Sequence, residues 1–300
     1  MKSVDVLPDV LPDVLFEVRP LTTLGLIFTI AAKEFKDNLR NRWLLMMSGI
    51  LLLLSLCVSF MGSAVSGHLV MLDPAQLISS LVTLSVFILP LGAILLSYDS
   101  FVGEKESGTL LLLLTYPLAP WHIVCGKFLG HGGVMAVACF LGFGITCGLL
   151  LFLGATDANI PLLMGFIHLI CSSILLSLIF VLIGYWVSLA VQEKAKALGI
   201  LLLLWFVLVL VYDLVLLTAL VGLADSLNRE WFNVVILLNP TDLFRALNLL
   251  ANPAENLAAK SSLALVAQTG LSLPLMYAIL TAWVGILLLG CTGYFKRIEV

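Results

Sequence analysis

Six long apolar stretches, each near the length that a helix needs to cross a bilayer, constrain the fold of this chain more than any other feature. They cover residues 44–62, 77–96, 128–153, 162–187, 197–220 and 273–291. A helix needs about 20 apolar residues to span the hydrocarbon core, and in lipid it satisfies its own backbone hydrogen bonds. Of the 300 residues, 61% are hydrophobic and only 11% are charged, too few for a soluble domain of this size. The sequence therefore predicts an all-α polytopic membrane protein with six transmembrane helices.

The charge balance, the cysteines and the missing catalytic motifs exclude several classes of function. The 15 lysines and arginines are outnumbered by 18 aspartates and glutamates, which argues against a nucleic-acid-binding protein. The six cysteines contain no Cys-x-x-Cys pair, so neither a disulfide framework nor a zinc site is expected. Gly126-Lys127 resembles the end of a phosphate-binding loop, but Trp121 stands where that loop needs glycine and Phe128 where it needs serine or threonine. We therefore expect no catalytic residue, no metal site and no bound nucleotide in this chain.

The lysines and arginines are unevenly distributed, and this sets the expected orientation. Nearly all of them lie before the first apolar stretch, in the connections after the second and fourth, or at the C-terminus. Arg229, Arg245 and Lys260 are the exceptions, and all three lie in the long segment after the fifth stretch. Because cytoplasmic loops are enriched in lysine and arginine, both termini are predicted to be cytoplasmic and residues 222–272 external.

Two segments of different character precede the first apolar stretch. Residues 1–20 repeat Asp-Val-Leu-Pro, and prolines at this spacing prevent a helix, so we expect a disordered acidic extension. In residues 21–42, Leu24, Phe28 and Phe35 lie at helical spacing, with charged residues mostly between the apolar positions. That pattern is typical of an interfacial amphipathic helix. Residues 43–300 then form the six-span transmembrane domain.

Asp213 is the most informative single residue of the apolar stretches, because a carboxylate in lipid is costly unless it is paired, protonated or facing water. Two interpretations stay open: Asp213 lines a translocation path, or it forms a structural hydrogen bond to another span. His168, expected at a similar depth, is a candidate partner, although a lone histidine there is more often a packed side chain. Asp99 and Asp213 are expected at opposite membrane faces, which excludes a pair of catalytic aspartates.

The connection between the second and third apolar stretches differs from the others. It contains the charged run Glu104-Lys105-Glu106, then the start of an apolar run at Gly108-Thr109-Leu110, and then the turn Tyr116-Pro117. Charges followed at once by an apolar helix start and a proline stop predict a short helix at the cytoplasmic interface. Such an element suits the transmission of force from a soluble partner to the membrane spans.

This connection resembles the coupling segment of type-2 ABC transporter permeases. The resemblance is carried by Glu104-x-x-x-Gly108-Thr109-Leu110, by Tyr116-Pro117 and by Gly126-Lys127-Phe128. More narrowly, the chain is similar to the permeases of a transporter that serves nitrous oxide reductase maturation. Three further segments carry that similarity, namely residues 33–43, residues 205–217 with Tyr212-Asp213-Leu214, and residues 238–245 with Asn239-Pro240-Thr241. The resemblance covers the chain from about residue 24 to the C-terminus and leaves out the N-terminal repeat.

The resemblance implies a type-2 ABC exporter fold, a homodimer and one ATPase subunit docked on each copy from the cytoplasm. ATP and Mg²⁺ would bind to that partner, so this chain would be a non-catalytic permease subunit without a cofactor of its own. Two cytoplasmic segments would couple it to the ATPase, through residues Glu104, Lys105, Glu106, Gly108, Thr109, Leu110, Gln192, Glu193 and Lys194.

The same resemblance implies a bacterial inner (cytoplasmic) membrane location, a periplasmic partner over the external face, and a sulfur or copper-related cargo. That cargo would serve assembly of the copper–sulfur centre of nitrous oxide reductase. In the external segment we expect short re-entrant or surface helices, followed by a turn over residues 239–245. Asp242 and Arg245 are spaced to pair on one helical face, either as a solvated pair or in contact with the periplasmic partner.

Two other functions stay open from the sequence. One is a type-2 ABC exporter of a different substrate, such as a lipid, a drug or an ion. The other is a membrane scaffold that docks assembly proteins without transporting anything.

Overall fold

The computed structural model describes residues 22–66, 73–110, 115, 118–153, 159–222, 229–252 and 271–297, and these residues form helices and no strand. The expected acidic extension over residues 1–20 lies outside this described part. Within it, six helices are long and apolar enough to cross a membrane, which confirms the predicted fold class. They are α2 (Trp43–Ser66), α3 (Pro74–Ser97), α6 (Pro120–Phe152), α7 (Asn159–Ala190), the α8–η1–α9 helix and α13 (Leu273–Phe295).

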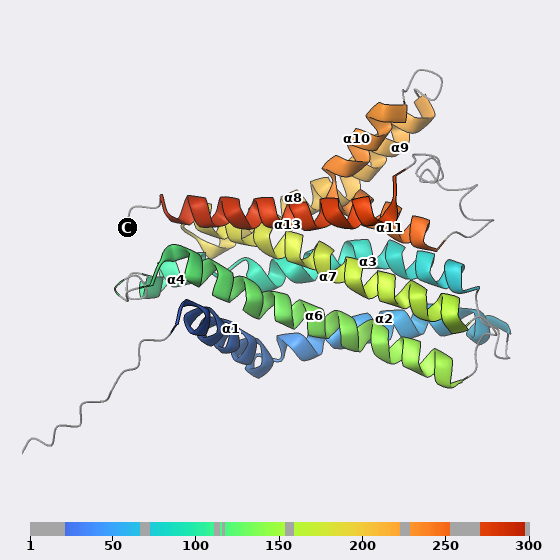
Figure 1. Ribbon diagram of the computed structural model, residues 1–300, viewed down its shortest axis with the longest axis horizontal. Helices are drawn as coiled ribbons and strands as arrows, with labels where there is room; N and C mark the ends of the chain where they lie inside the picture. Colours follow the sequence, from blue (N-terminus) through green and yellow to red (C-terminus); the bar gives the residue numbers. More distant parts are fainter. Residues whose placement is uncertain are drawn as a thin grey trace, which may run out of the picture.

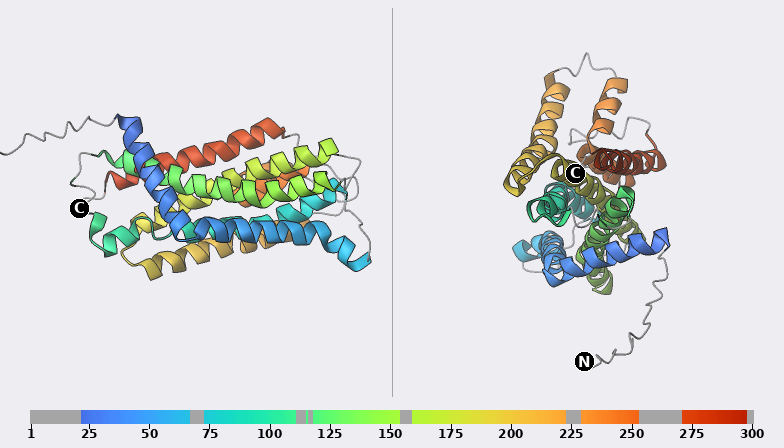
Figure 2. Two further views of the ribbon diagram at one scale, coloured as in Figure 1. Left: turned by 90° about the horizontal axis from the view of Figure 1, so that it is seen from below. Right: turned by 90° about the vertical axis from the view of Figure 1, so that its left-hand side faces the viewer.

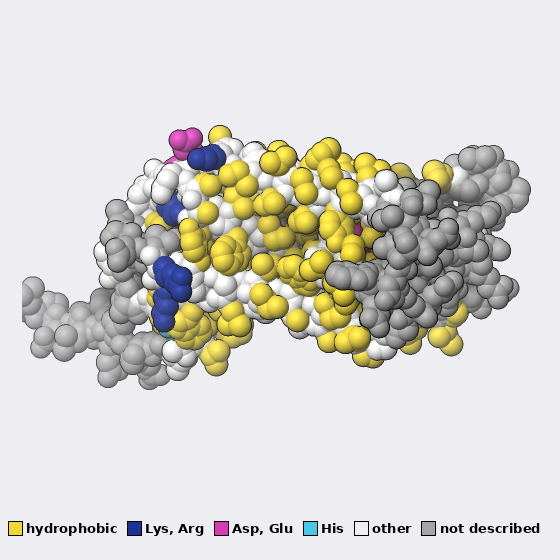
Figure 3. All heavy atoms as spheres, turned by 90° about the horizontal axis from the view of Figure 1, so that it is seen from above, with side chains coloured by type: hydrophobic (Ala, Val, Ile, Leu, Met, Phe, Trp, Pro, Cys, Tyr) yellow, Lys and Arg dark blue, Asp and Glu magenta, His cyan; other side chains and the backbone are white. Residues whose placement is uncertain are grey.

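The long helices run side by side along the long axis of the molecule (Figure 1). Hydrophobic side chains cover the middle of the face seen in Figure 3, and lysine and arginine side chains gather at the end where α4 and the C-terminal end of α13 lie. An apolar band with cations at one end is the surface expected of a membrane protein. This is the end that we expect to face the cytoplasm.

Helices α6 and α7 form the centre of the bundle, and α1 (Thr23–Arg40) packs against α6 from outside. Figure 2 shows α1 crossing the bundle at a steep angle near one end. Glycines make this close crossing possible: a Cβ atom added at Gly126 would lie 2.6 Å from Ile30, and one at Gly130 would lie 2.6 Å from Glu34. Any larger residue at these two positions would therefore push α1 away from α6.

The fifth span is not a continuous α-helix. It begins as α8 (Lys194–Phe206), widens to the π-helix η1 (Val207–Val211), and continues as α9 (Tyr212–Gly222). Beyond it, α10 (Arg229–Leu238) and α11 (Pro240–Ala251) follow, and α9 and α10 extend away from the bundle (Figure 1). Helix α11 instead packs between α3, α7 and α13.

The expected turn over residues 239–245 is wrong. Asn239 interrupts the helix for one residue, its side-chain Oδ1 accepts from the N–H of Thr241, and Pro240 occupies the first position of α11. Proline is well suited to that position, because the first N–H groups of a helix have no partner within it. The sequence Asn239-Pro240-Thr241 is therefore a helix start, and it directs Asp242 and Arg245 into the bundle, where both are buried.

Candidate coupling site at the cytoplasmic end

The short helix α4 (Val102–Glu106) contains the charged run of this connection, and its first residues are anchored in the bundle. The interfacial helix was predicted to start in the apolar run after these charges, and residues 111–114 and 116–117 of that run and its proline stop lie outside the described residues. Phe101 and Val102 are fully buried, and the hydroxyl of Ser188 on α7 accepts hydrogen bonds from both of their N–H groups, at 3.1 and 2.9 Å. These N–H groups belong to the helix start and have no partner within α4. Ser188 therefore caps a helix that lies 86 residues earlier in the chain, a role that the sequence did not reveal.

The two segments expected to dock the ATPase contact each other directly. The N–H of Lys194, at the start of α8, donates to Glu106 Oε1 at 2.7 Å, and the Lys194 ammonium pairs with Asp99 at 3.2 Å. Lys105 donates to the carbonyls of Leu189 and Val191 at the end of α7. A displacement of α4 would therefore be transmitted to α8 through polar contacts.

The side chains of these two segments differ in exposure: some face solvent, and others make contacts within the chain. Glu106, Thr109, Gln192 and Glu193 are exposed and available to a partner. Glu104, Lys105 and Lys194 are half-buried in contacts within the chain, and Leu110 is buried in the core. Gly108 has a φ of 70°, a conformation that strongly favours glycine, and it ends the turn after α4.

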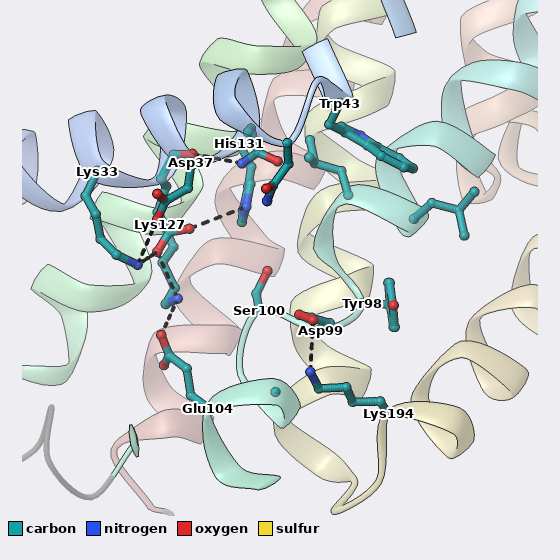
Figure 4. Close-up of a pocket in the computed structure, with 16 residues that line it drawn as sticks. Lys33, Asp37, Trp43, Tyr98, Asp99, Ser100, Glu104, Lys127, His131 and Lys194 are labelled. Carbon is teal, nitrogen blue, oxygen red and sulfur yellow. Dashed lines mark hydrogen bonds and ion pairs between the residues drawn. The ribbon is translucent and has the colours of Figure 1, made fainter. Parts of the chain in front are cut away.

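Glu104 of α4 belongs to a group of polar residues that we call the inner cluster: Glu34, Glu104, Lys127, His131 and Tyr185. All of them are buried except Glu104, which is half-buried. Lys127 Nζ lies 2.7 Å from Glu104 Oε1 and 3.1 Å from Glu34 Oε1, and Lys127 is only 3% exposed. Figure 4 shows Lys127 and His131 of α6, Glu104 of α4 and Lys33 of α1 lying close together. A buried ammonium is tolerated only when it is paired, and here one lysine ties together three elements from distant parts of the chain.

The electrostatics of Glu34 follow from this geometry. Burial is the largest single influence on its carboxyl group and opposes ionisation, but Lys127, His131 and Lys33 together outweigh burial and lower the pKa of Glu34 to about 2. Glu34 is therefore ionised throughout the physiological range, and the ion pair between α1 and α6 persists.

His131 and Tyr185 extend the inner cluster into α7. His131 Nδ1 lies 2.6 Å from the Tyr185 hydroxyl, and His131 Nε2 lies 3.8 Å from Glu34 Oε2. Tyr185 is fully buried and packs edge-on against Phe101 at the start of α4. Lys33-Glu34 and Gly126-Lys127 are visible in the sequence, but no local pattern indicated that these charges would meet.

A second charged group, which we call the outer cluster, lies toward the other end of the bundle: Asp213, Asn239, Asp242 and Arg245. Arg245 Nη1 lies 2.7 Å from Asp213 Oδ1 and 3.5 Å from Asp242 Oδ1. Asp242 is fully buried and Arg245 is 9% exposed. The predicted pairing of Asp242 with Arg245 is present, but the expectation of a solvated pair is wrong, because both residues are buried. Contact of this pair with a periplasmic partner stays a prediction.

Burial is also the main influence on the carboxyl group of Asp242. It raises the pKa of Asp242 to about 6, against the lowering effect of the Arg245 charge, and the neighbouring Asp213 raises it further. Asp242 therefore changes its charge just below neutral pH.

The outer cluster sits on the π-helix in the fifth span. Asn239 Nδ2 and the Thr241 hydroxyl both donate to the carbonyl of Leu208 within η1, at 2.9 and 3.2 Å. A π-turn displaces backbone carbonyls from their usual helical partners, and such turns are frequent at functional sites. The start of α11 is thus bonded directly to η1, close to where Asp213 pairs with Arg245.

His168 does not pair with Asp213. Its Nδ1 lies 3.0 Å from the Tyr277 hydroxyl on α13, whereas Asp213 pairs with Arg245 of α11. Arg245 was not expected as the partner of Asp213, because 31 residues of chain separate the two and only the packing of α11 brings them together.

Comparison with known proteins shows which family this architecture belongs to. A family model described as "ABC-2 family transporter protein" matches residues 28–300. A protein of Stutzerimonas stutzeri named "Probable ABC transporter permease protein NosY" is 40% identical over 272 residues, which cover 90% of this chain and 98% of the relative. A protein of the same name from Pseudomonas aeruginosa is 40% identical over 274 residues, which cover 91% of this chain and 99% of the relative.

Proposed function

This chain belongs to the ABC-2 family and is a multi-pass membrane permease of an ABC transporter; from that premise we propose how it is driven. Its exposed coupling residues receive a separate cytoplasmic ATPase of the NosF type, which binds ATP and Mg²⁺. The permease itself catalyses no bond chemistry and works as a homodimer with both termini in the cytoplasm.

The observation that carries this proposal is the link between the two coupling segments. Helix α4 and the start of α8 are joined through the Glu106–Lys194 contact, and α4 is joined to α1 and α6 through Lys127. An ATPase that moves α4 therefore acts on four helices at once. This is the arrangement needed to convert ATP binding on a partner into a rearrangement of the spans.

The cargo and the outer partner follow from the resemblance to NosY permeases. We propose that the transporter moves a sulfur or copper-related species for assembly of the copper–sulfur centre of nitrous oxide reductase, with a NosD-type protein on the periplasmic side. The 40% identity over nine-tenths of the chain supports this assignment.

Asp213 is the residue that we propose for the translocation path. Its side chain is 42% exposed although it lies in an apolar helix, and the exposed part is free to meet a polar cargo. His168 is a weaker candidate for the same path, since its ring is half-buried against Tyr277.

Deletion of the gene, with copper and sulfide measured on purified nitrous oxide reductase, tests the cargo. We expect an enzyme that lacks only its copper–sulfur centre. A fully loaded enzyme would contradict the maturation role and would leave an exporter of another substrate.

Coupling is tested separately, by ATP turnover of the reconstituted ATPase–permease complex. Gly108→Pro removes the left-handed turn after α4 and is expected to abolish stimulated turnover while the complex stays assembled. Cys57→Ser, at an exposed position of α2, is the matched control. Unchanged turnover in Gly108→Pro would favour a scaffold without transport.

A further inference from the structure

Helix α1 carries a row of exposed cations along one face. Lys33, Lys36 and Arg40 follow one another at i, i+3 and i+7, so their side chains lie on the same side of the helix. With these cations, four further residues of α1 line one shallow hollow on the surface: Phe28, Thr29, Ala32 and Asp37. Because all three cations are exposed, they are available to a ligand outside the chain.

This cationic row is only partly neutralised within the chain. Asp37 lies 3.5 Å from Lys33 and 3.3 Å from Arg40, so two of the three cations share one carboxylate on this face. Lys36 has no ion-pair partner among the residues that the structure describes. Like charges three or four residues apart repel each other on a helix. An anion bound at Lys36 would therefore remove an unfavourable interaction between Lys36 and its neighbours.

A row of exposed apolar side chains lies beside the cations. Leu24, Phe28 and Leu39 are 65%, 64% and 46% exposed. With about 100° of rotation per residue, they occupy the sector of α1 between the cations and the face that packs against α6. Phe28 lines the same hollow as Lys36 and Arg40, so the apolar and the cationic surfaces are continuous.

The orientation of α1 places both rows at the membrane surface. The helix crosses the bundle at a steep angle near the end that we expect to face the cytoplasm, so its axis lies close to the membrane plane (Figure 2). A helix in this orientation inserts its apolar side among the lipid chains and holds its cations at the level of the head groups. Anionic lipids attract each lysine or arginine at this level, whereas zwitterionic lipids have no net charge that could do so.

We propose that this face of α1 binds anionic phospholipids of the cytoplasmic leaflet. The lipid phosphate binds at Lys36 and Arg40, and the acyl chains pack on Leu24 and Phe28. A soluble anion would use the cations but not the apolar row, so a lipid accounts for both. Since Lys127 ties α1 to α6 and α4, a lipid held on α1 also stabilises the position of the coupling helix. This inference depends on neither the cargo nor the nitrous oxide reductase role.

Native mass spectrometry of the detergent-purified, full-length permease tests the proposal, with phosphatidylglycerol and phosphatidylcholine of identical acyl chains as probes. We expect phosphatidylglycerol to bind more tightly. Lys36→Gln is expected to reduce this preference about fivefold, which is the effect of one cation near an anionic surface. Lys36→Arg keeps the charge and is expected to keep the preference. Arg40→Gln should reduce it less than Lys36→Gln, because Asp37 already neutralises part of the Arg40 charge.

Two further variants separate this face of α1 from its surroundings. The double variant Lys296→Gln with Arg297→Gln is the matched control, because it removes two exposed cations at the same end of the bundle, and it is expected to leave the preference unchanged. Phe28→Ser is expected to weaken the binding of both lipids equally, since the acyl chains of the two probes are identical. Thermal melting of each variant verifies that it is folded.

Several results would overturn the proposal. Equal binding of the two lipids, or an unchanged preference in Lys36→Gln, would show that α1 does not select an anionic lipid. An equal loss in the C-terminal double variant would show that any cation at this end of the bundle suffices. Binding of glycerol 3-phosphate as tight as that of phosphatidylglycerol would identify a soluble ligand. A preference that appears only after deletion of residues 2–20 would assign the cationic row to the acidic N-terminal extension.

Discussion

The inner and outer clusters are built alike but behave differently. In each, one cation binds two carboxylates and lies over a phenylalanine ring: Lys127 with Phe101 at 5.5 Å, and Arg245 with Phe87 at 6.0 Å. Yet the pKa of Glu34 falls to about 2, whereas that of Asp242 rises to about 6. A list of partners alone would not have distinguished the two clusters.

The difference comes from distance and burial. Glu34 lies 3.1 Å from both Lys127 and Lys33, so two ammonium groups stabilise its charge. Asp242 is 3.5 Å from Arg245, which lies closer to Asp213, and no other cation pairs with it among the described residues. The inner cluster is therefore a permanent set of ion pairs, and the outer one contains a carboxyl group that gains a proton easily.

Removal of the cation from the inner cluster is expected to have the largest effect. Lys127→Met leaves the buried Glu34 and the half-buried Glu104 without their shared partner, which costs about 3–5 kcal/mol in the free energy of unfolding. Denaturant titration of the detergent-solubilised protein measures this loss. The double variant Lys127→Met with Glu34→Gln is expected to recover part of it, and a loss below 1 kcal/mol would contradict a structural role for the cluster.

The pH dependence of stability separates the two clusters further. Since folding raises the pKa of Asp242 from 3.8 to about 6, the folded state binds this proton more tightly, and stability decreases as the pH rises. Between pH 4.5 and pH 6 the decrease is about 1.5 kcal/mol. Glu34 contributes only a small slope of the opposite sign there, because most of its stabilisation is already present at pH 4.5 and is lost as the pH falls toward 2. Asp242→Asn is expected to remove the slope, and an equal slope in that variant would refute the assignment.

Removal of the cation from the outer cluster should cost less than removal of Lys127. In Arg245→Met, Asp242 can take up a proton near neutral pH, and Asp213 is partly exposed, so neither is left as a buried charge. We expect a loss of about 1–2 kcal/mol at pH 7, and a smaller loss at pH 5. The same titration measures it, and an effect as large as that of Lys127→Met would remove the distinction between the clusters.

Removal of one hydrogen bond between α11 and the π-helix η1 is expected to have the smallest effect on the free energy of unfolding. Thr241→Val removes the hydroxyl that donates to the Leu208 carbonyl, but Asn239 still donates to the same oxygen. We expect a loss of about 1 kcal/mol, the usual value for one hydrogen bond. Thr218→Val, at an exposed position of α9, is the control, because its hydroxyl bonds only its own helix. Equal effects of the two variants would show that the contact with η1 contributes nothing.

Much of the fold could be predicted from the sequence because it depends on local composition. Each span had to be a long apolar run, and a short helix, α4, lies in the charged connection, although it starts before the charges and not after them. Residues 239–245 were misjudged because Asn-Pro is compatible with both a turn and a capped helix start. Which of the two forms depends on whether α11 can pack against α3, α7 and α13. The local sequence carries no information on that packing.

By itself, the sequence determined that this chain spans a membrane and how many times it does so. Only the tertiary structure decided that Lys127 joins Glu34 to Glu104, and that Arg245 is the partner of Asp213. The physical reason is that the free energy of transfer into the membrane depends on the composition of each segment alone, so the spans can be predicted from the sequence. The pairing of buried charges is set by distances of about 3 Å, and those exist only after helices from remote parts of the chain have packed.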